Sequence, residues 1–537
     1  MRCRTIRFLL ADHLSLTLSS LSSVDPVHDI ILMTEVANEA THVRYHAKKL
    51  AFLLSAMRHF AERLTDEFQL KVDYIRLDDP ENTGSLRAEL VRAVARHKPE
   101  RVIVAFPSEH RLLRDMTDWS AACGVPVEVR EDNRFFCGRT DFARWAQGRR
   151  QLRMEPFYRL MRERSGLLMT PEGSPEGGQW EPMRLPPLTG KADIEQHPQD
   201  EHGLSKPLCG KFPCGGKTTD LHVPEPFRTT PDKTTKEVLA LVGQRFPNHF
   251  GELEPFWFAV THADAERVFD AFCLHALPRF CSTHDLMRKN HATLFHAVIG
   301  HYLNVGLLDP RKICQRVEED YQKGRITLSA AEGFIRQILG WREFARGLYW
   351  LKMPNYAGFN YFNAYGPLPG FFWSGETTMN CLKQCIDQTK REAYAHHTQR
   401  LTVLGNFSML AGIAPLEVME WFLLAFVDAV EWALIPNVQM ALHADGGLFV
   451  GKPNAVGGKF VHHVSDYCEE CLFEPDLTTG EFSCPLNYLY WNFLAANRVK
   501  LENNQRMRFA YSIMDKMPKE TLIAIRRSAE AFLNSLG

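Results

Sequence analysis

Three cysteines near the C-terminal end of the chain follow a spacing that constrains the fold more than any other feature. Cys468, Cys471 and Cys484 stand in C-x2-C-x12-C, and Cys381 lies far upstream. A C-x2-C pair places two thiolates on one turn of backbone, a third cysteine a dozen residues later can return to the same centre, and a distant fourth can close it. Four thiolates suit zinc or an iron–sulfur cluster, and spacing does not choose between them; unrelated buried thiols are the alternative. The sequence predicts one metal centre, with the nearby Cys385 left outside it.

Size and composition place the chain among folded proteins with two or three domains. It has 537 residues, 45% hydrophobic and 24% charged. The N-terminal apolar run stops at Asp12, too early for a signal sequence, and no run reaches the roughly 18 apolar residues of a membrane span. Thirteen cysteines without a secretory signal indicate reduced thiols, so we expect a cytoplasmic protein without membrane contact. With a net charge of −1, binding to nucleic acid must come from a local patch.

Residues 1–135 alternate short apolar runs with helical patterns. Runs rich in Val, Ile and Phe predict strands at 5–10, 29–35, 72–77, 101–106 and 126–129. Helical patterns at 40–64 and 85–97 separate them, and this β-α-β order predicts a doubly wound, Rossmann-like parallel sheet with helices on both faces. No G-x-G-x-x-G follows the first strand, which argues against ordinary dinucleotide binding. Ligands of such sheets favour the carboxyl ends of the strands, near Asp12 and Glu35.

Residues 136–235 predict an inter-domain helix and a long connector. Seven arginines lie within 144–164 with aromatic residues among them, so this helix can follow phosphates; a solvated helix packed on the next domain is an equal alternative. Residues 210–218 imitate a phosphate loop, but the first glycine is out of register and no strand precedes it.

Residues 236–537 show almost only helical patterns, such as those at 377–404 and 415–434. This half is rich in tryptophan. Tryptophans in helical domains are usually core, but an all-α domain this aromatic can also enclose a flat cofactor. The predicted architecture is therefore an α/β domain, a connector and a large all-α domain that holds the cysteine centre.

Four segments of the helical half together resemble one family. They read G-F-I-R-Q-I-L-G-W-R-E-F at 333–344, Y-A-H-H with Q-R-L at 394–401, G-N-F leading to L-A-G-I at 405–413, and S-D-Y-C with two further cysteines at 465–485. Their order and spacing resemble the iron–sulfur bacterial cryptochromes and photolyases, the prokaryotic (6-4) photolyase group. The resemblance covers nearly the whole chain except roughly 181–225.

The resemblance implies an α/β antenna domain, a helical domain that binds FAD, and a [4Fe–4S] cluster on Cys381, Cys468, Cys471 and Cys484. The implied activity is that of a (6-4) photolyase, a deoxyribodipyrimidine photolyase-type lyase. Light drives an electron from reduced FAD to a (6-4) pyrimidine–pyrimidone photoproduct in UV-damaged DNA, after the damaged base has left the stack. We expect a monomer.

Two other functions stay open at this point. A cryptochrome-like blue-light photoreceptor would carry the same cofactors with little or no repair activity. A zinc-stabilised nucleic-acid-binding protein would keep the cysteine centre and a degenerate flavin pocket, and would be colourless when pure.

The paired His396 and His397 are the predicted catalytic residues. Repair moves a hydroxyl and a proton between the two bases, and a histidine can supply a proton near neutral pH. Adjacent residues on a helix point about 100° apart. One histidine is therefore expected to donate the proton while the other orients the lesion or touches flavin, and the spacing does not say which; two core histidines bonded to backbone carbonyls are the alternative.

The resemblance also implies the remaining site residues. For FAD they are Trp341, Arg342, Arg400, Asn406, Asp428, Asn437 and Tyr302. For electron transfer they are Trp373 and Trp421. For an antenna chromophore, with 6,7-dimethyl-8-ribityllumazine as the candidate, they are Asp12, Glu35 and Glu39.

Several positions depart from the family pattern. Serines expected near the FAD phosphates are Ala297 and Gly300, a flavin-facing glutamate is Leu434, and a tyrosine of the electron chain is Val430. The loop that follows Trp180, on the DNA side in the family, is also atypical. These changes bear on flavin tuning, electron transfer and repair, whereas the cysteine ligands are intact.

Overall fold

The computed structural model describes residues 3–149, 151–180, 223–448 and 450–536. Its first part contains a five-stranded sheet in the order β3-β2-β1-β4-β5. The strands are β1 (Thr5–Leu9), β2 (Asp29–Thr34), β3 (Val72–Ile75), β4 (Arg101–Ala105) and β5 (Val127–Arg130). Every neighbouring pair is parallel. The predicted parallel sheet is confirmed, each strand within two residues of its expected ends.

Helices cover both faces of this sheet, as the alternation of side chains along each strand requires. Ile6, Phe8 and Leu10 belong to a small apolar core beneath α3 (Leu86–His97) and α5 (Trp119–Cys123). Leu9, between them in sequence, belongs to a larger core that includes α2 (Ala47–Asp66) and continues through the helical half. The α2 face of the sheet is therefore built into the rest of the molecule.

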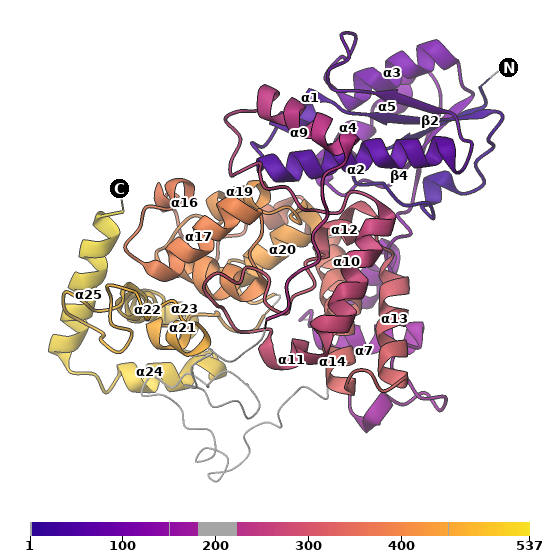
Figure 1. Ribbon diagram of the computed structural model, residues 1–537. Coiled ribbons are helices and arrows are strands. Elements are labelled where there is room, and N and C mark those ends of the chain that lie inside the picture. Colours follow the sequence, from indigo (N-terminus) through magenta and orange to yellow (C-terminus); the bar gives the residue numbers. More distant parts are fainter. Residues whose placement is uncertain (1–2, 150, 181–222, 449, 537) are drawn as a thin grey trace.

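The rest of the described chain is helical, with the sheet at one end and α24 and α25 at the other (Figure 1). The other helices of the sheet half are α1 (Ala37–Thr41) and α4 (His110–Met116). After β5 come α6 (Arg139–Ala146), α7 (Met154–Ser165), α9 (Lys233–Arg245), α10 (His262–His275), α11 (Phe280–Thr283), α12 (Gly300–Val305), α13 (Pro310–Gln322), α14 (Leu328–Ile335), α15 (Glu343–Lys352), α16 (Phe371–Ser374), α17 (Asn380–Glu392), α18 (Asn406–Leu410), α19 (Pro415–Ala425), α20 (Glu431–Ala441), α21 (Gly458–Val464), α22 (Pro485–Ala496), α23 (Arg498–Leu501), α24 (Arg508–Met514) and α25 (Lys519–Asn534). Two π-helical segments, Arg336–Arg342 and Gln399–Gly405, precede α15 and α18.

Two helices predicted as continuous are interrupted. The pattern over 377–404 breaks at Ala393, whose φ of 53° is left-handed and ends α17. The pattern over 415–434 breaks after Ala425, because the chain becomes extended at Phe426 before α20 begins. His396 therefore lies just before the next helix rather than inside one, which corrects the expectation that both histidines share a helix.

The N-terminal end of α2 joins the two halves. The Lys49 ammonium donates to the carbonyls of Leu423 (2.8 Å) and Ala429 (2.7 Å), which lie in α19 and in the segment before α20. His46 Nε2 donates to the Lys390 carbonyl at 2.9 Å. Burial lowers the pKa of Lys49 to about 7, while the carboxylates of Glu109 and Asp428 oppose this shift.

The arginine-rich stretch forms two helices, α6 and α7, and serves partly as structure. Arg162 is fully buried and donates to the carbonyls of Leu167 (3.3 Å) and Trp180 (2.9 Å). This arginine is thus unavailable to phosphates. The phosphate-loop imitation at 210–218 falls outside the described residues. Within those residues, no helix combines the length and apolarity needed to cross a membrane.

Candidate functional site

The four predicted metal ligands line a single small cavity. Cys381 lies in the first turn of α17, Cys468 and Cys471 follow α21, and Cys484 immediately precedes α22. The other walls are mostly apolar: Met379, Val461, Phe473, Pro485 and Leu486. Cys385, one turn further along α17, is buried but does not line the cavity. The ten cysteines whose side chains the structure describes are all free of disulfides.

The donor set fits a cationic metal cluster. Burial and the neighbouring cysteines raise the pKa of Cys468 to about 12, and burial raises that of Cys484 to about 12 as well. Thiols in such a place stay protonated unless a bound cation stabilises the thiolates. Gly458 supplies the room: a Cβ there would lie 2.6 Å from the Cys484 sulfur. Glycine is therefore required where the backbone approaches this ligand.

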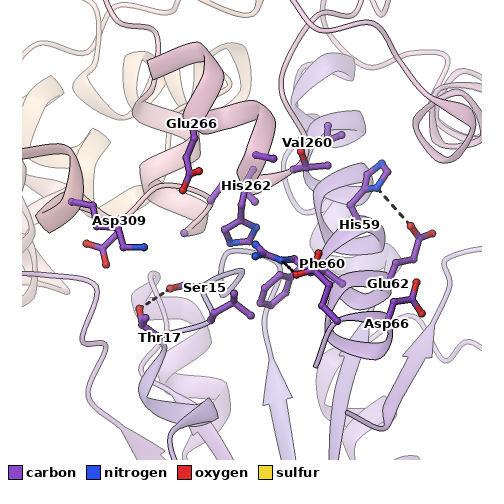
Figure 2. A pocket seen from close by; sticks show the side chains of 18 residues that line it. Ser15, Thr17, His59, Phe60, Glu62, Asp66, Val260, His262, Glu266 and Asp309 are labelled. Atoms are coloured by element: carbon purple, nitrogen blue, oxygen red, sulfur yellow. Dashed lines mark hydrogen bonds and ion pairs between the residues drawn. The ribbon is translucent and has the colours of Figure 1, made fainter. Parts of the chain in front are cut away.

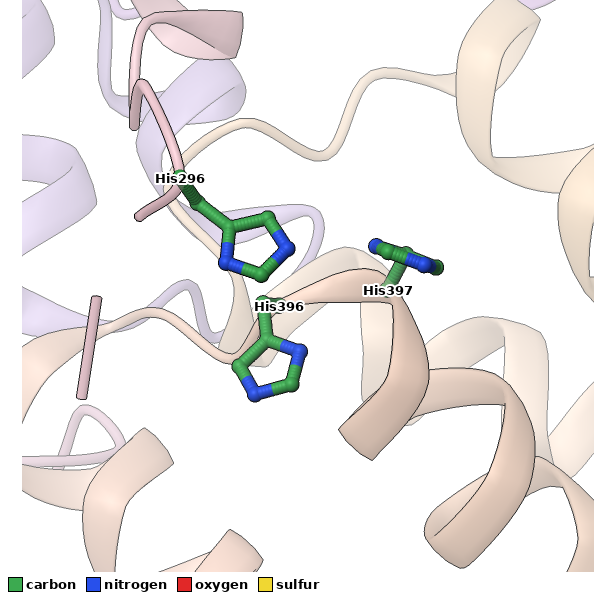
Figure 3. A group of neighbouring side chains, drawn as sticks. All are labelled: His296, His396 and His397. Atoms are coloured by element: carbon green, nitrogen blue, oxygen red, sulfur yellow. The ribbon is translucent and has the colours of Figure 1, made fainter. Parts of the chain in front are cut away.

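The predicted histidine pair meets a third histidine (Figure 3). His296 approaches from the segment before α12, and its ring stacks on that of His396 with centroids 4.5 Å apart and planes inclined by 13°. His397 lies to one side, with its centroid 5.4 Å from that of His296. One ring nitrogen of each lies within 4.8 Å of the others. Stacked rings direct their lone pairs side by side rather than at one point, so this trio suits a polar organic group better than a metal ion.

The two adjacent histidines differ in burial and charge. His396 is 2% exposed, and burial, with the other histidines and Arg400, lowers its pKa well below 6.5. Burial likewise lowers the pKa of His296 to about 3. The side chain of His397 is 44% exposed, and its Nε2 lies 3.3 Å from a carboxylate oxygen of Asp285. Of the pair, only His397 therefore has both solvent contact and a counter-ion for a proton.

Asp285 is held ionised by its surroundings. Burial raises the pKa of its carboxyl group, but the hydrogen bond from His397 and the charges of His284, His397 and His296 outweigh that effect, so the pKa lies below its usual value. A carboxylate at this position can stabilise a protonated His397 ring.

Buried polar atoms without partners indicate that a polar ligand is accommodated near the histidines. Among the described residues, neither ring nitrogen of His396 has a hydrogen-bond partner, and Nε2 of the stacked His296 ring also lacks one. Buried polar groups are almost always satisfied by protein, water or ligand. A polar ligand at these rings would satisfy the free nitrogens.

The residues predicted to bind FAD fall into distinct environments. Arg400 Nη2 lies 2.9 Å from the Asp428 carboxylate, and the Arg400 guanidinium lies over the Phe426 ring. Both π-helical segments carry predicted flavin residues, Trp341 and Arg342 in one and Arg400 in the other, and such turns occur often at functional sites. The Arg342 guanidinium lies over the Phe135 ring (4.0 Å) and near the Trp432 ring (5.2 Å), and these two rings meet edge to face.

Three other predicted flavin residues already have protein partners. Asn406 exchanges two hydrogen bonds with the backbone of Val456 (2.9 and 3.0 Å). The Tyr302 hydroxyl accepts from the Ala259 amide, and Asn437, exposed on α20, donates to the Ala433 carbonyl of its own helix. Their part in FAD binding stays a prediction.

The departure at Gly300 has a steric reason. A Cβ at this position would lie 3.2 Å from the Asp428 Cβ and 3.3 Å from one of its carboxylate oxygens. The Asp428 side chain occupies the space that a serine side chain at position 300 would fill.

Trp373 and Trp421 are bridged by a ring that the sequence did not bring forward. Trp373 is 48% exposed, whereas Trp421 is buried. Phe250 lies between them, with its centroid 5.9 Å from each. Trp421 continues inward to Phe426 (5.8 Å), the ring beneath Arg400. An aromatic path thus runs from the surface to the Arg400–Asp428 pair.

The predicted antenna residues line one interdomain cavity. Asp12, Glu35 and Glu39 lie at the carboxyl edge of the sheet, and His301, Val427 and Val430 close the cavity from the helical half. Both oxygens of Glu35 are occupied, by Arg58 (2.7 and 2.9 Å), the Tyr74 hydroxyl (2.7 Å) and the Leu77 amide (2.9 Å). Arg111 donates to both oxygens of Glu39, and Ser108 to Asp12.

A separate cavity of about 440 Å³ lies between α2, α10 and α13. Figure 2 shows His262 in its centre beside Phe60, with Glu266, Asp309 and Asp66 around it. It contains none of the residues predicted for catalysis, metal binding or cofactor binding.

Sequence reasoning missed His296 and Asp285 as members of the histidine pocket. Both lie far from His396 along the chain and show no ligand-like spacing. The only available signal was the histidine that opens the H-A-V-I-G-H-Y stretch at 296–302.

Comparisons with known proteins agree on one group. The model of the family described as deoxyribodipyrimidine photo-lyase-related protein matches residues 7–181 and 216–258. A (6-4) photolyase of Agrobacterium fabrum (strain C58 / ATCC 33970) is 42% identical over 529 residues, which cover 98% of this chain and 99% of that protein. An uncharacterised mimivirus protein, R855, is 28% identical over 106 residues, covering 20% of this chain and 79% of its own.

Solved structures support the fold alone. A bacterial class III photolyase from Agrobacterium tumefaciens superposes with a TM-score of 0.54 at 13% identity, covering 100% of this chain and 98% of its own. The Synechocystis sp. PCC6803 cryptochrome superposes with a TM-score of 0.51 at 12% identity, covering 96% and 99%.

Proposed function

The chain belongs to the iron–sulfur bacterial cryptochrome and photolyase family, and on this premise we propose that it is a (6-4) photolyase that repairs UV-damaged DNA with light. The observation that carries the proposal is the histidine pocket, in which neutral, buried His396 and partly buried His296 stand beside a half-exposed His397 with its own carboxylate. A pocket of this kind can hold a flipped base and deliver one proton to it.

Family membership implies two cofactors, FAD and a [4Fe–4S] cluster. Cys381, Cys468, Cys471 and Cys484 are the proposed cluster ligands, and the centre is structural in this proposal. Trp341, Arg342, Arg400, Asn406, Asp428, Asn437 and Tyr302 are the proposed FAD-binding residues. Reduced FAD, when bound, supplies the light-driven electron for repair.

His397 is the proposed proton donor. Its side chain is open to a ligand, and Asp285 pairs with the charged form of the ring. His396 stays neutral, so it orients the lesion or the flavin through its free ring nitrogens. Since the reaction moves a hydroxyl and a proton from one base to the other, His397 recovers its proton when the bases separate.

The aromatic path is proposed to replenish electrons from solvent. Trp373 meets solvent, Trp421 is buried, and the 5.9 Å spacing on either side of Phe250 keeps consecutive rings close. Because the path ends beneath Arg400, it does not depend on the side chain at Val430.

The interdomain cavity is proposed to bind the antenna chromophore, with 6,7-dimethyl-8-ribityllumazine as the candidate. Asp12 and Glu39 are the better placed of the predicted contacts, since the carboxylate of Glu35 is fully committed to protein donors. We further propose that the protein acts as a monomer.

The deciding experiment uses purified protein and an oligonucleotide that carries one (6-4) photoproduct. The absorption spectrum should show flavin peaks on a broad iron–sulfur shoulder, and blue light with a reductant should restore the undamaged bases. A protein that photoreduces its flavin without repairing the lesion would be a blue-light receptor. A colourless, zinc-containing protein would remove both functions.

A further inference from the structure

The peptide group that joins Ala395 to His396 is held from two sides. Its carbonyl, on Ala395, accepts from Arg400 Nε at 2.6 Å, and its N–H, on His396, donates to Gln399 Oε1 at 3.0 Å. Arg400 belongs to the proposed flavin contacts, whereas Gln399 contacts Tyr467, the residue before the cysteine ligand Cys468. The direction in which the His396 and His397 side chains leave the backbone depends on the plane of this peptide.

The Gln399 amide has no remaining hydrogen-bonding capacity. Gln399 is 1% exposed and exchanges two hydrogen bonds with the amide of Gln388 (2.9 and 3.0 Å). Its oxygen also accepts from His396, and its nitrogen also donates to the Tyr467 hydroxyl at 2.9 Å. Two acceptor positions and two donor positions are therefore all used, so the amide cannot turn over without losing several bonds.

Tyr467 connects this amide to the cysteine centre. It is 1% exposed and immediately precedes the ligand Cys468. Its backbone carbonyl accepts from the Asn380 amide at 2.7 Å, and Asn380 immediately precedes the ligand Cys381. The segment that carries Cys381 is thus joined to the segment that carries Cys468 by a hydrogen bond beside the cysteines. The Tyr467 hydroxyl joins both segments to Gln399.

We propose that Gln399 is a positioning residue for the His396–His397 pair and that Tyr467 makes this position depend on an intact cysteine centre. The proposal rests on the proposed function for its catalytic meaning. In it, the centre does more than hold the fold together: it fixes the Tyr467 hydroxyl, the hydroxyl fixes the Gln399 amide, and the amide fixes the peptide that aims the histidines.

The test compares Tyr467→Phe with Tyr488→Phe in the full-length holoprotein. Tyr488 also adjoins the centre, packing in α22 one turn after Cys484, but its ring lies against Phe532 instead of reaching Gln399. Each change removes one hydroxyl and nothing else. Iron, sulfide and flavin contents are measured first, so that the comparison concerns loaded protein.

The direct readout is modification of histidines by diethyl pyrocarbonate in the dark, mapped by mass spectrometry. His396 is buried and should be protected in the wild type and in Tyr488→Phe, while the half-exposed His397 serves as the internal reference. In Tyr467→Phe the rate for His396 should rise about tenfold, the factor expected for one lost hydrogen bond of about 1.4 kcal/mol. Unchanged protection of His396 in a loaded Tyr467→Phe protein would overturn the proposal.

A second variant covers the case in which Tyr467→Phe loses the cluster. Gln399→Met lies outside the cysteine-bearing segments and has about the length of glutamine but neither its donor nor its acceptor, so it loses the bonds to Gln388, Tyr467 and the His396 N–H together. It should expose His396 to the reagent with iron content unchanged; protection equal to wild type would again overturn the proposal.

Repair kinetics then show whether the coupling serves catalysis. Tyr467→Phe should lower kcat for the (6-4) oligonucleotide about tenfold while leaving KM unchanged, because the hydroxyl aims a proton donor and contacts no DNA. If the wild type repairs nothing, the proposed function fails, whereas the modification experiment still decides whether Gln399 and Tyr467 hold the histidines.

Discussion

The cysteine centre lies at the N-terminal end of α17 and the histidine pocket follows its C-terminal end, but the two sites are built differently. Four thiols from three segments converge on a mostly apolar cavity, and a cation is all that the site needs to be complete. In the histidine pocket, the stacked rings of His296 and His396 come from two segments and leave three of their four nitrogens without a partner, and a polar ligand is needed to satisfy them. The cysteine centre selects a metal because all of its ligands are thiols. In the histidine pocket the side chains are of one type, and differences in their burial give them different parts in a reaction.

Removing a thiol should have the largest effect. Binding of a metal to its thiolates contributes on the order of 10 kcal/mol, comparable with the whole free energy of unfolding of a domain. Cys468→Ala is therefore expected to abolish soluble, iron-loaded protein, measured by yield, iron content and circular dichroism. Cys385→Ala, one turn beyond Cys381 and outside the cavity, should retain full iron content. A folded, iron-replete Cys468→Ala protein would show that this residue is not a structural ligand.

Removing the proton donor should leave the fold intact and affect only the reaction. His397→Ala is expected to retain FAD and cluster and to lose repair by about 10²–10⁴-fold, the usual contribution of general acid–base catalysis. Asp285→Asn keeps the shape of the side chain but removes the counter-ion of His397, so its repair rate should fall less than that of His397→Ala. Single-turnover repair under saturating light measures both. Wild-type repair by His397→Ala would exclude it as the donor.

Adding one methyl group to the cysteine centre tests how closely its backbone is fitted. In Gly458→Ala the new Cβ would lie 2.6 Å from the Cys484 sulfur and 3.0 Å from its Cβ. Overpacking of this kind costs about 1–3 kcal/mol, so the melting temperature and iron content should both fall. Gly370→Ala, where a Cβ meets no atom within 4 Å, is the matched control. Equal stability of the two variants would mean that the ligand segment adapts.

Acid should lower the free energy of unfolding through the histidine pocket, and the slope of this free energy against pH can be measured. Because burial holds the pKa of folded His396 well below 6.5, the unfolded chain takes up a proton below that pH that the folded chain does not. The free energy of unfolding should therefore fall by up to about 1.4 kcal/mol per pH unit for this group as the pH drops below about 6.5. Urea unfolding at pH 7.5, 6.5 and 5.5 measures the slope, and His396→Gln should reduce it. An unchanged slope would assign the acid sensitivity to other groups.

The parts that could be predicted from sequence are those whose signal is local. Short apolar runs rich in Val, Ile and Phe placed the five strands, and the C-x2-C-x12-C spacing with Cys381 brought forward the four cysteines that line one cavity. The break at Ala393 could not be predicted, because an alanine at positive φ carries no local mark and is imposed by tertiary packing. His296 and Asp285 reach the site only through that packing.

Burial separated residues that look alike in sequence. His396 and His397 are neighbours of one type, yet one is 2% exposed and the other has a side chain that is 44% exposed. Glu35 and Glu39 both follow the second strand, yet Glu35 accepts four hydrogen bonds from protein groups while Glu39 is bound by a single arginine. Such distinctions arise from neighbours distant in the chain and become visible only in the fold.

The connection made by Lys49 bears on how this architecture can be recombined. A lysine of the sheet half donates to two carbonyls of the helical half, close to the segment that carries Asp428. Any chimera that joins this sheet to another helical half must reproduce those carbonyl positions, or it leaves a buried ammonium without acceptors. A crossover at the connector therefore keeps the contact only when the new helical half presents carbonyls at the positions of Leu423 and Ala429.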